Sequence, residues 1–167
     1  MSNKMGKKFL ENKPIRFWIR DEIEEIIKTE NIDRTRFYEF SKLAYEDIIK
    51  KFYYTFSDRK NYSPSQIKLE YNLMHFRSEL KSEIIDCFFR TYNWTEYLTT
   101  IKNVIPYSTQ KVFLILCEGW VYEGCIDEIF TVLNEVGCIK DFYIVSDKFD
   151  WFIAVTDMED NAIFYKR

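Results

Sequence analysis

Apolar residues recur every three or four positions after Pro14, and acidic residues fill many of the positions between them. This spacing is typical of a helix that buries one face. The apolar face comprises Ile15, Trp18, Ile19, Ile23, Ile26 and Ile27, and the acidic face comprises Asp21, Glu22, Glu24 and Glu25. Proline suits the first turn of a helix, because an N–H there would have no intrahelical partner. We therefore predict a helix after Pro14 and a frayed, lysine-rich start over residues 1–13.

A second stripe predicts a helix from Asp33, as its N-cap, toward Phe56. Its apolar face comprises Phe37, Phe40, Ala44, Ile48 and Phe52, widened by Tyr45, Ile49 and Tyr53. The pattern leaves residues 64–91 open between strand and helix. Residues 67–73 alternate between apolar and polar as in a strand, whereas Leu80, Ile84, Cys87 and Phe88 return to helical spacing.

A third helix is predicted between Asn93 and Pro106. Asn93 and Glu96 have the spacing of a capping box, in which each side chain covers the other residue's free backbone N–H. The apolar face comprises Trp94, Tyr97, Leu98 and Ile101. Pro106 ends the helix, because the residue before a proline is disfavoured in the helical conformation.

The last third of the chain begins with a continuous apolar run, residues 112–117, which is typical of a central strand covered on both faces. Ile126, Ile129, Phe130 and Leu133 then predict a short helix, and Gly137 stands where a left-handed C-terminal cap is usual. Three further apolar runs follow, residues 142–145, 151–155 and 163–165. The loops between them are long enough for hairpins and too short for crossovers, so these strands should form an antiparallel meander.

These elements predict one α+β domain over residues 1–167, in which residues 14–106 are mainly helical and residues 107–167 form the sheet. The helices should pack on a mostly antiparallel sheet in the order strand–helix–strand–strand–strand. A chain of 167 residues suits one domain, and its 47% hydrophobic content can supply a core. Trp151 begins an apolar strand, so we expect its side chain to face that core.

Several function classes are disfavoured. No apolar run reaches the roughly 18 to 20 residues that span a bilayer, and the start has no apolar stretch of the kind found in signal peptides. The four cysteines form no CxxC pair, which predicts reduced thiols in a cytoplasmic protein. Residues 111–167 carry 11 acidic and 5 basic side chains, so this third should not bind nucleic acid.

Catalytic and metal-binding motifs are also missing. His75 is the single histidine, whereas zinc sites and most nucleophilic triads need an imidazole beside further ligands. The chain has four glycines and no glycine-rich phosphate loop. Residues 157–161 lack the spacing and the turn glycine of a calcium loop. We predict no catalytic residue, no metal and no cofactor.

The candidate binding residues lie in the loops of the acidic third: Asp147, Asp150, Asp157, Glu159, Asp160, Trp120 and Glu123. Loops attract aspartate for local reasons, because its side chain bonds nearby backbone. Trp120 and Glu123 lie in a glycine-bracketed loop, residues 118–124, and aromatic groups are enriched at protein interfaces. The alternative is that Trp120 folds back onto the sheet. Successive hairpin turns lie at opposite ends of a meander, so only one of the two acidic ends can dominate a binding surface.

The stretches FLILCEGWVYEG, VLNEVG and FYIVSDKFDWFIAV resemble the end of a family of small bacterial proteins that look like immunity proteins of secreted toxins. The shared motif is Tyr143, Ile144, Val145 and Ser146, followed by Phe149, Asp150 and Trp151, and the similarity covers roughly residues 94–165. Because Asp150 belongs to this motif, the resemblance favours the end with Asp147 and Asp150 as the binding surface. Members of that family often carry histidines in the loop after the tryptophan strand. Residues 157–160 hold Asp-Met-Glu-Asp instead, which puts a histidine-dependent role in doubt here.

The resemblance implies a non-catalytic cytoplasmic protein that inhibits a bacterial toxin by binding it. An acidic inhibitor would complement a basic toxin domain, since toxic nucleases bind phosphate. Two alternatives remain open at this point: a structural or regulatory protein with an unrelated partner, and an enzyme that relies on carboxylates. The sequence leaves the oligomeric state open.

Overall fold

The computed structural model describes residues 18–57, 80–81, 85–90, 94–107, 109–116, 119–137, 139, 141–156 and 161–166. Within these ranges the chain forms four helices: α1 (Ile19–Thr29), α2 (Lys42–Phe56), α4 (Trp94–Val104) and α5 (Ile126–Glu135). It also forms seven strands: β1 (Phe37–Glu39), β2 (Ile85–Arg90), β3 (Lys111–Leu116), β4 (Val121–Cys125), β5 (Phe142–Ser146), β6 (Trp151–Thr156) and β7 (Asn161–Lys166). The strands make one sheet in the order β1-β4-β3-β5-β6-β7-β2. Every neighbouring pair is antiparallel, and the predicted α+β class is confirmed.

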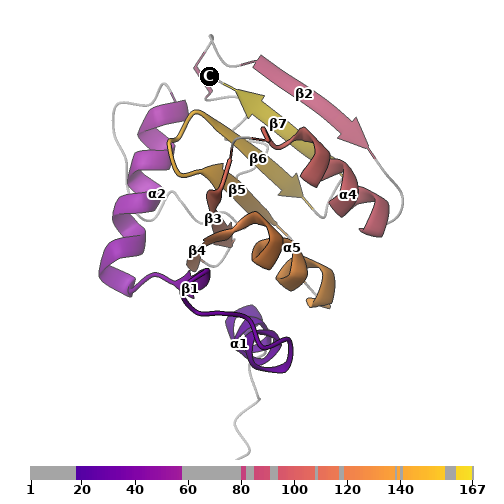
Figure 1. The fold of residues 1–167 in the computed structure, drawn as a ribbon. Helices are drawn as coiled ribbons and strands as arrows, with labels where there is room; N and C mark the ends of the chain where they lie inside the picture. The colour runs from indigo at the N-terminus through magenta and orange to yellow at the C-terminus, as the bar shows by residue number, and fades with distance from the viewer. Residues whose placement is uncertain are drawn as a thin grey trace, which may run out of the picture.

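Helices cover both faces of the sheet (Figure 1). Along β3 the side chains alternate between two cores, as the period of a strand requires. Leu114 belongs to the core shared with α1, α4 and α5, whereas Phe113 and Ile115 belong to the core shared with α2. The apolar run over β3 is therefore a central strand buried on both faces, as predicted.

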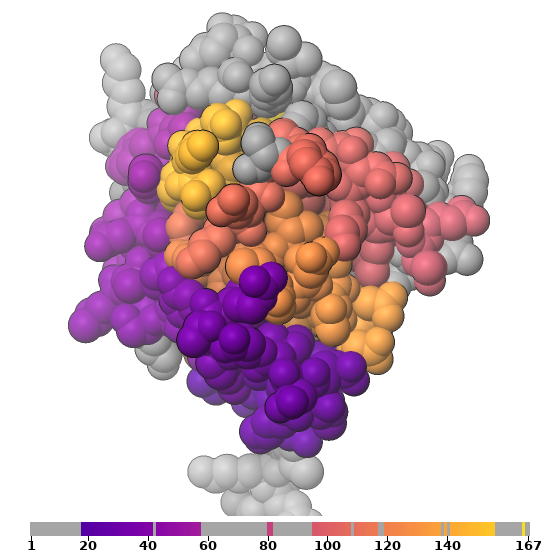
Figure 2. Space-filling view, in the orientation of Figure 1, coloured from indigo at the N-terminus to yellow at the C-terminus, as the bar shows by residue number. Residues whose placement is uncertain are grey.

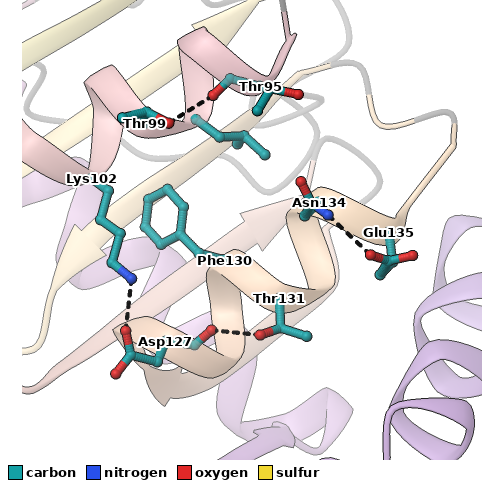
Figure 3. A pocket seen from close by; sticks show the side chains of 9 residues that line it. Thr95, Thr99, Lys102, Asp127, Phe130, Thr131, Asn134 and Glu135 are labelled. Atoms are coloured by element: carbon teal, nitrogen blue, oxygen red, sulfur yellow. Dashed lines mark hydrogen bonds and ion pairs between the residues drawn. The ribbon is translucent and has the colours of Figure 1, made fainter.

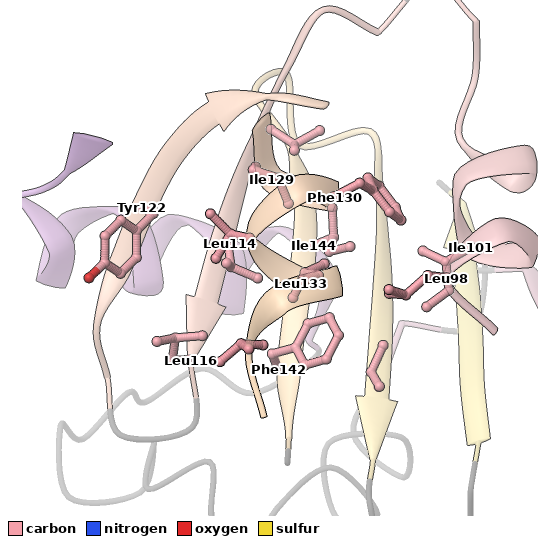
Figure 4. Packing of buried hydrophobic residues seen from close by; sticks show 14 of the residues in the cluster. Leu98, Ile101, Leu114, Leu116, Tyr122, Ile129, Phe130, Leu133, Phe142 and Ile144 are labelled. Carbon is pink, nitrogen blue, oxygen red and sulfur yellow. The ribbon is translucent and has the colours of Figure 1, made fainter. Parts of the chain in front are cut away.

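The first core joins α5 and α4 to the middle of the sheet. Figure 4 shows Ile129, Phe130 and Leu133 of α5 lying over β3 and β5. Leu98 and Ile101 of α4 extend the same layer. Residues three or four apart share one face of a helix, and these members of the two predicted apolar stripes are buried.

The second core is aromatic. From α2, the Phe52 ring lies 5.1 Å from the rings of both Tyr143 and Phe152, measured between centroids. Phe56 is 4.6 Å from Phe152, which in turn stacks on Tyr165 at 4.4 Å. Tilted, edge-to-face and stacked pairs of this kind add to the stabilisation from buried area. Core packing therefore accounts for many of the aromatic residues of this chain.

The predicted start of the second helix is wrong. Residues 37–39 form strand β1, and α2 begins only at Lys42. The Asp33 carboxylate caps a turn instead, accepting the Thr35 N–H and the Thr35 hydroxyl at 2.8 Å each. Phe37 is buried and stacks on Tyr122 at 5.0 Å. The pairing with β4 therefore overrides a helical spacing that Phe37 also satisfies.

The predicted loop over residues 118–124 is also wrong, because Val121–Cys125 is strand β4. Gly119 closes the tight turn between β3 and β4 with a φ of 92°, a conformation that other residues rarely adopt. Within that turn the Leu116 N–H donates to the Trp120 carbonyl at 2.9 Å. The predicted strand–helix–strand–strand–strand elements are all present, with β4 added between the first strand and the helix.

One open question is answered and one further expectation is corrected. Residues 85–90, which the spacing left open between strand and helix, pair with β7 along their full length as strand β2. Gly137 is not left-handed; its N–H donates to the Glu22 carboxylate of α1 at 2.7 Å and so ties the end of α5 to α1. The predicted strand over residues 67–73 and the cap at Asn93 lie outside the described residues.

Arginine–carboxylate pairs hold the segment from α1 to β1, drawn in indigo in Figure 2, together internally and attach it to α5. Arg36 pairs with Glu128 of α5. Within the segment, Arg20 pairs with Glu39 at 2.8 Å, which raises the pKa of the guanidinium. Each pair is partly exposed, so we expect these bonds to orient the segment more than they stabilise it.

Candidate functional site

The turn between β5 and β6 is built around a buried serine. Ser146 is 2% exposed, and its hydroxyl accepts the backbone N–H groups of Asp150 at 3.0 Å and Trp151 at 3.4 Å. The same hydroxyl donates to the Asp150 carboxylate. Phe149 adopts a left-handed conformation and buries its ring against Phe113 at 5.5 Å. The Ser146-to-Trp151 motif therefore specifies a tightly bonded hairpin.

A second turn lies beside this hairpin, because β3 is the neighbour of β5 in the sheet. The Thr109 N–H donates to the Pro106 carbonyl at 2.9 Å and closes the connection between α4 and β3. The two turns enclose a hollow of about 310 Å³. Its lining comprises Pro106, Thr109, Gln110, Ser146, Asp147, Lys148, Asp150 and Trp151. The hollow is therefore mainly polar, with the buried Trp151 as part of its wall.

The charges of this hollow are open to a partner. Asp147, Lys148 and Asp150 are exposed, and Asp147 makes no ion pair with any residue that the structure describes. Tyr107, the residue after Pro106, is fully exposed. Three other carboxylates of the acidic third are paired with cations: Glu123 with Lys111, Asp127 with Lys102 and Glu128 with Arg36. The carboxylates that stay available to a partner therefore include those at this end of the sheet.

The structure separates Trp120 from Asp147. Val112 pairs with Ser146 at one end of β3, whereas Leu116, at the other end, bonds to Trp120. Trp120 packs against the core and lies under the Arg20 guanidinium, which is 5.2 Å from the ring centroid. Trp120 is therefore turned back onto the fold, as the alternative interpretation expected.

Glu123 also does not share the hollow. It lies within β4, where the Lys111 ammonium is 3.2 Å from its carboxylate. Burial raises the pKa of Tyr38 on β1, and the nearby Glu123 carboxylate raises it further. Asp157, Glu159 and Asp160 lie outside the described residues. The structure thus brings together Asp147 and Asp150 of the predicted set.

A larger groove, of about 420 Å³, runs between α4 and α5 (Figure 3). The Lys102 ammonium donates to Asp127 across it at 2.7 Å and lowers the pKa of that carboxyl. Thr99 and Thr131 donate to carbonyls of their own helices at 2.9 Å each. The polar groups here bond to one another, so they offer a ligand less than the hollow does.

The described residues contain neither a metal-binding cluster nor a membrane-spanning helix. They contain no group of three or more His, Cys, Asp or Glu side chains arranged to hold a metal ion. The single histidine, His75, lies outside them. None of the described helices is long and apolar enough to cross a membrane.

The sequence pattern did not identify Tyr107, Thr109 and Gln110 as site residues. Tyr107 does carry a usable signal, because it is an aromatic residue directly after a helix-ending proline and outside every apolar stripe. Thr109 and Gln110 carry none, since their place beside Asp150 depends on β3 and β5 being neighbours.

The architecture is that of an α+β protein with an antiparallel sheet between two helical layers. The chain belongs to the Family of unknown function (DUF6756), which matches residues 16–167. A comparison with curated proteins finds no match to this chain.

Proposed function

We propose that this chain is a non-catalytic cytoplasmic binding protein of the immunity type, which inhibits a bacterial toxin by covering it. The observation that carries the proposal is the hollow at the β5–β6 turn. Tyr107 is fully exposed and directly follows Pro106, which lines the hollow together with Asp147 and Asp150. Exposed tyrosine is typical of binding hot spots, because it buries a large area and loses little side-chain entropy.

The rigidity of this surface supports the proposal. Ser146 fixes the hairpin through its backbone bonds, and the bond between Thr109 and Pro106 fixes the facing turn. A surface that is already ordered loses little conformational entropy on binding. The resemblance of the C-terminal third to immunity proteins points to the same function, and the acidic charge suits a basic toxin domain.

Site-specific crosslinking tests the proposal. A photo-reactive phenylalanine analogue replaces Tyr107 in the native host, and the crosslinked protein is identified by mass spectrometry. The same analogue at Tyr54, which is exposed on α2, is the matched control. The captured protein is then expressed in a second bacterial host with and without this chain.

We expect position 107, and not position 54, to capture a toxin domain, and we expect co-expression to restore growth. A captured protein that is harmless to the host, or growth that this chain does not restore, contradicts the immunity function. A complex with a harmless partner would favour a structural or regulatory role.

A further inference from the structure

We infer that the hollow at the β5–β6 turn receives an arginine side chain of the partner protein. This inference rests on the proposed function, because it assigns the chemistry that the same surface recognises. The lining supplies carboxylates from Asp147 and Asp150 and further oxygen atoms from Thr109 and Gln110. These acceptors come from two facing turns, so they approach an occupant from more than one side.

The charge of the lining favours a cation. Asp147 and Asp150 contribute two negative charges, and Lys148 contributes one positive charge. The Asp150 carboxylate is already held by the Ser146 hydroxyl, which fixes its position before any partner arrives. Asp147 carries no such bond to another described residue and is the carboxylate most free to pair with an incoming cation.

The shape of the lining favours arginine over lysine. A guanidinium presents five N–H donors in a plane, and acceptors spread over two turns can engage several of them together. An ammonium is a compact and strongly hydrated charge that gains less from such a spread. Tyr107 adds an exposed aromatic ring next to the lining residue Pro106, and aromatic faces attract guanidinium groups.

Titration with blocked amino acids tests the inference without the natural partner. N-acetyl-arginine amide, N-acetyl-lysine amide and N-acetyl-citrulline amide are added to the full ¹⁵N-labelled chain, up to 100 mM. Citrulline matches the shape of arginine and has no charge. We expect saturable shifts in the backbone amides of Thr109, Gln110 and Asp150 with arginine, weaker shifts with lysine and none with citrulline.

Two variants locate the binding. Asp147→Asn should weaken arginine binding about two- to fivefold, the range of one exposed ion pair. Tyr107→Ala should weaken it by a similar factor, as expected for an exposed cation–π contact, about two- to fivefold. Glu30→Gln changes an exposed carboxylate on the turn after α1 and should leave the affinity unchanged.

The inference is overturned by equal shifts with arginine and citrulline, by lysine binding as tightly as arginine, or by no shift at 100 mM. Unchanged affinity in Asp147→Asn also overturns it. These outcomes are independent of the proposed function. If position 107 captures a toxin but the chain does not bind arginine, the proposed function stands and the arginine inference fails. If the hollow binds arginine but the captured partner is harmless, the arginine inference stands and the proposed function fails.

Discussion

Trp151 begins β6, and its side chain is 2% exposed within the core shared by α4 and α5. Trp151→Ala should lower the free energy of unfolding by about 3 to 5 kcal/mol, as other buried aromatic truncations do. Urea denaturation at neutral pH measures the loss. Tyr107→Ala removes an exposed ring and should change stability by less than about 0.5 kcal/mol. Equal stabilities of the two variants would contradict the buried position of Trp151.

Ser146 carries the hydrogen bonds of the β5–β6 turn. Ser146→Ala removes the acceptor of two backbone N–H groups and the donor to Asp150, so we expect a loss of about 1 to 3 kcal/mol in unfolding free energy. Ser41→Ala is the matched control, because Ser41 precedes α2 without a side-chain cap bond. Thermal unfolding of both variants is compared. A Ser146 variant that unfolds with the wild type would show that the hydroxyl is dispensable.

At the scale of elements, β1 depends on a glycine opposite it. A Cβ on Gly124 would lie 2.6 Å from Cδ2 of the buried Phe37 ring and 3.1 Å from Cγ1 of Ile129. Gly124→Ala should therefore cost about 1 to 3 kcal/mol through overpacking. Because β1 is the element displaced, hydrogen exchange at the Phe40 and Cys125 amides should accelerate; both bond across the β1–β4 pair at 2.9 and 2.8 Å.

A second substitution distinguishes overpacking against Phe37 from a general loss of stability. Phe37→Ala removes the ring that the new methyl group meets, so the double variant should lose less stability than the two single losses together. Strict additivity would show that Phe37 is not the group under strain.

The bridge between α4 and α5 responds to pH. Lys102 lowers the pKa of Asp127, through its hydrogen bond first and its charge second. A carboxyl with a depressed pKa in the folded state stabilises the fold above its unfolded pKa, and this contribution disappears as the pH falls through the folded pKa. Both side chains are largely exposed, so the contribution should be no more than about 1 kcal/mol.

Lys102→Met tests this bridge, because it keeps an apolar stem and removes the charge. Carboxyl NMR titration of the variant should return the pKa of Asp127 toward its ordinary value of 3.8. High salt should move the wild-type value in the same direction. If the substitution left the pKa of Asp127 unchanged, the pairing of Asp127 with Lys102 would be contradicted.

The elements that sequence spacing predicted are those whose period repeats. Ile23 and Ile27 of α1 continue one stripe over several turns, and α4 and β3 are equally regular. β1 has three residues, too few to show a period, and Phe37 fits a helical stripe as well as a strand. Stacking of Phe37 on Tyr122, far away in the sequence, decides between them. The spacing of neighbouring residues could not predict that long-range contact.

The candidate site likewise has a part that local sequence predicted and a part that depends on long-range contacts. Loop placement of Asp147 and Asp150 followed from the apolar runs on either side of them. The turn that completes the hollow, with Gln110, depends on the strand order of the sheet. Most of the sequence motif around Ser146 builds the hairpin, because Ser146 and Phe149 are buried, and Asp150 is its exposed member in the hollow.

At the scale of the whole molecule, the acidic charge of residues 111–167 is unevenly available. Glu128 pairs with Arg36, Asp127 with Lys102 and Glu123 with Lys111. A neutralised carboxylate contributes little to the field that a partner meets. The β5–β6 end keeps exposed carboxylates, and the exposed Tyr107 directly follows the lining residue Pro106, so we expect this end to face the partner.

The association rate of Asp147→Lys with the captured partner tests this account most directly. Exposed charges steer encounter, so at low salt the variant should associate more slowly than wild type, and the salt dependence of its rate should flatten. Its stability should stay within about 0.5 kcal/mol of wild type. Glu30→Lys reverses an exposed charge on the α1–β1 turn and should bind at a rate much closer to wild type. If Asp147→Lys associates at the wild-type rate at low salt, or if Glu30→Lys slows binding equally, the β5–β6 end is not the partner surface.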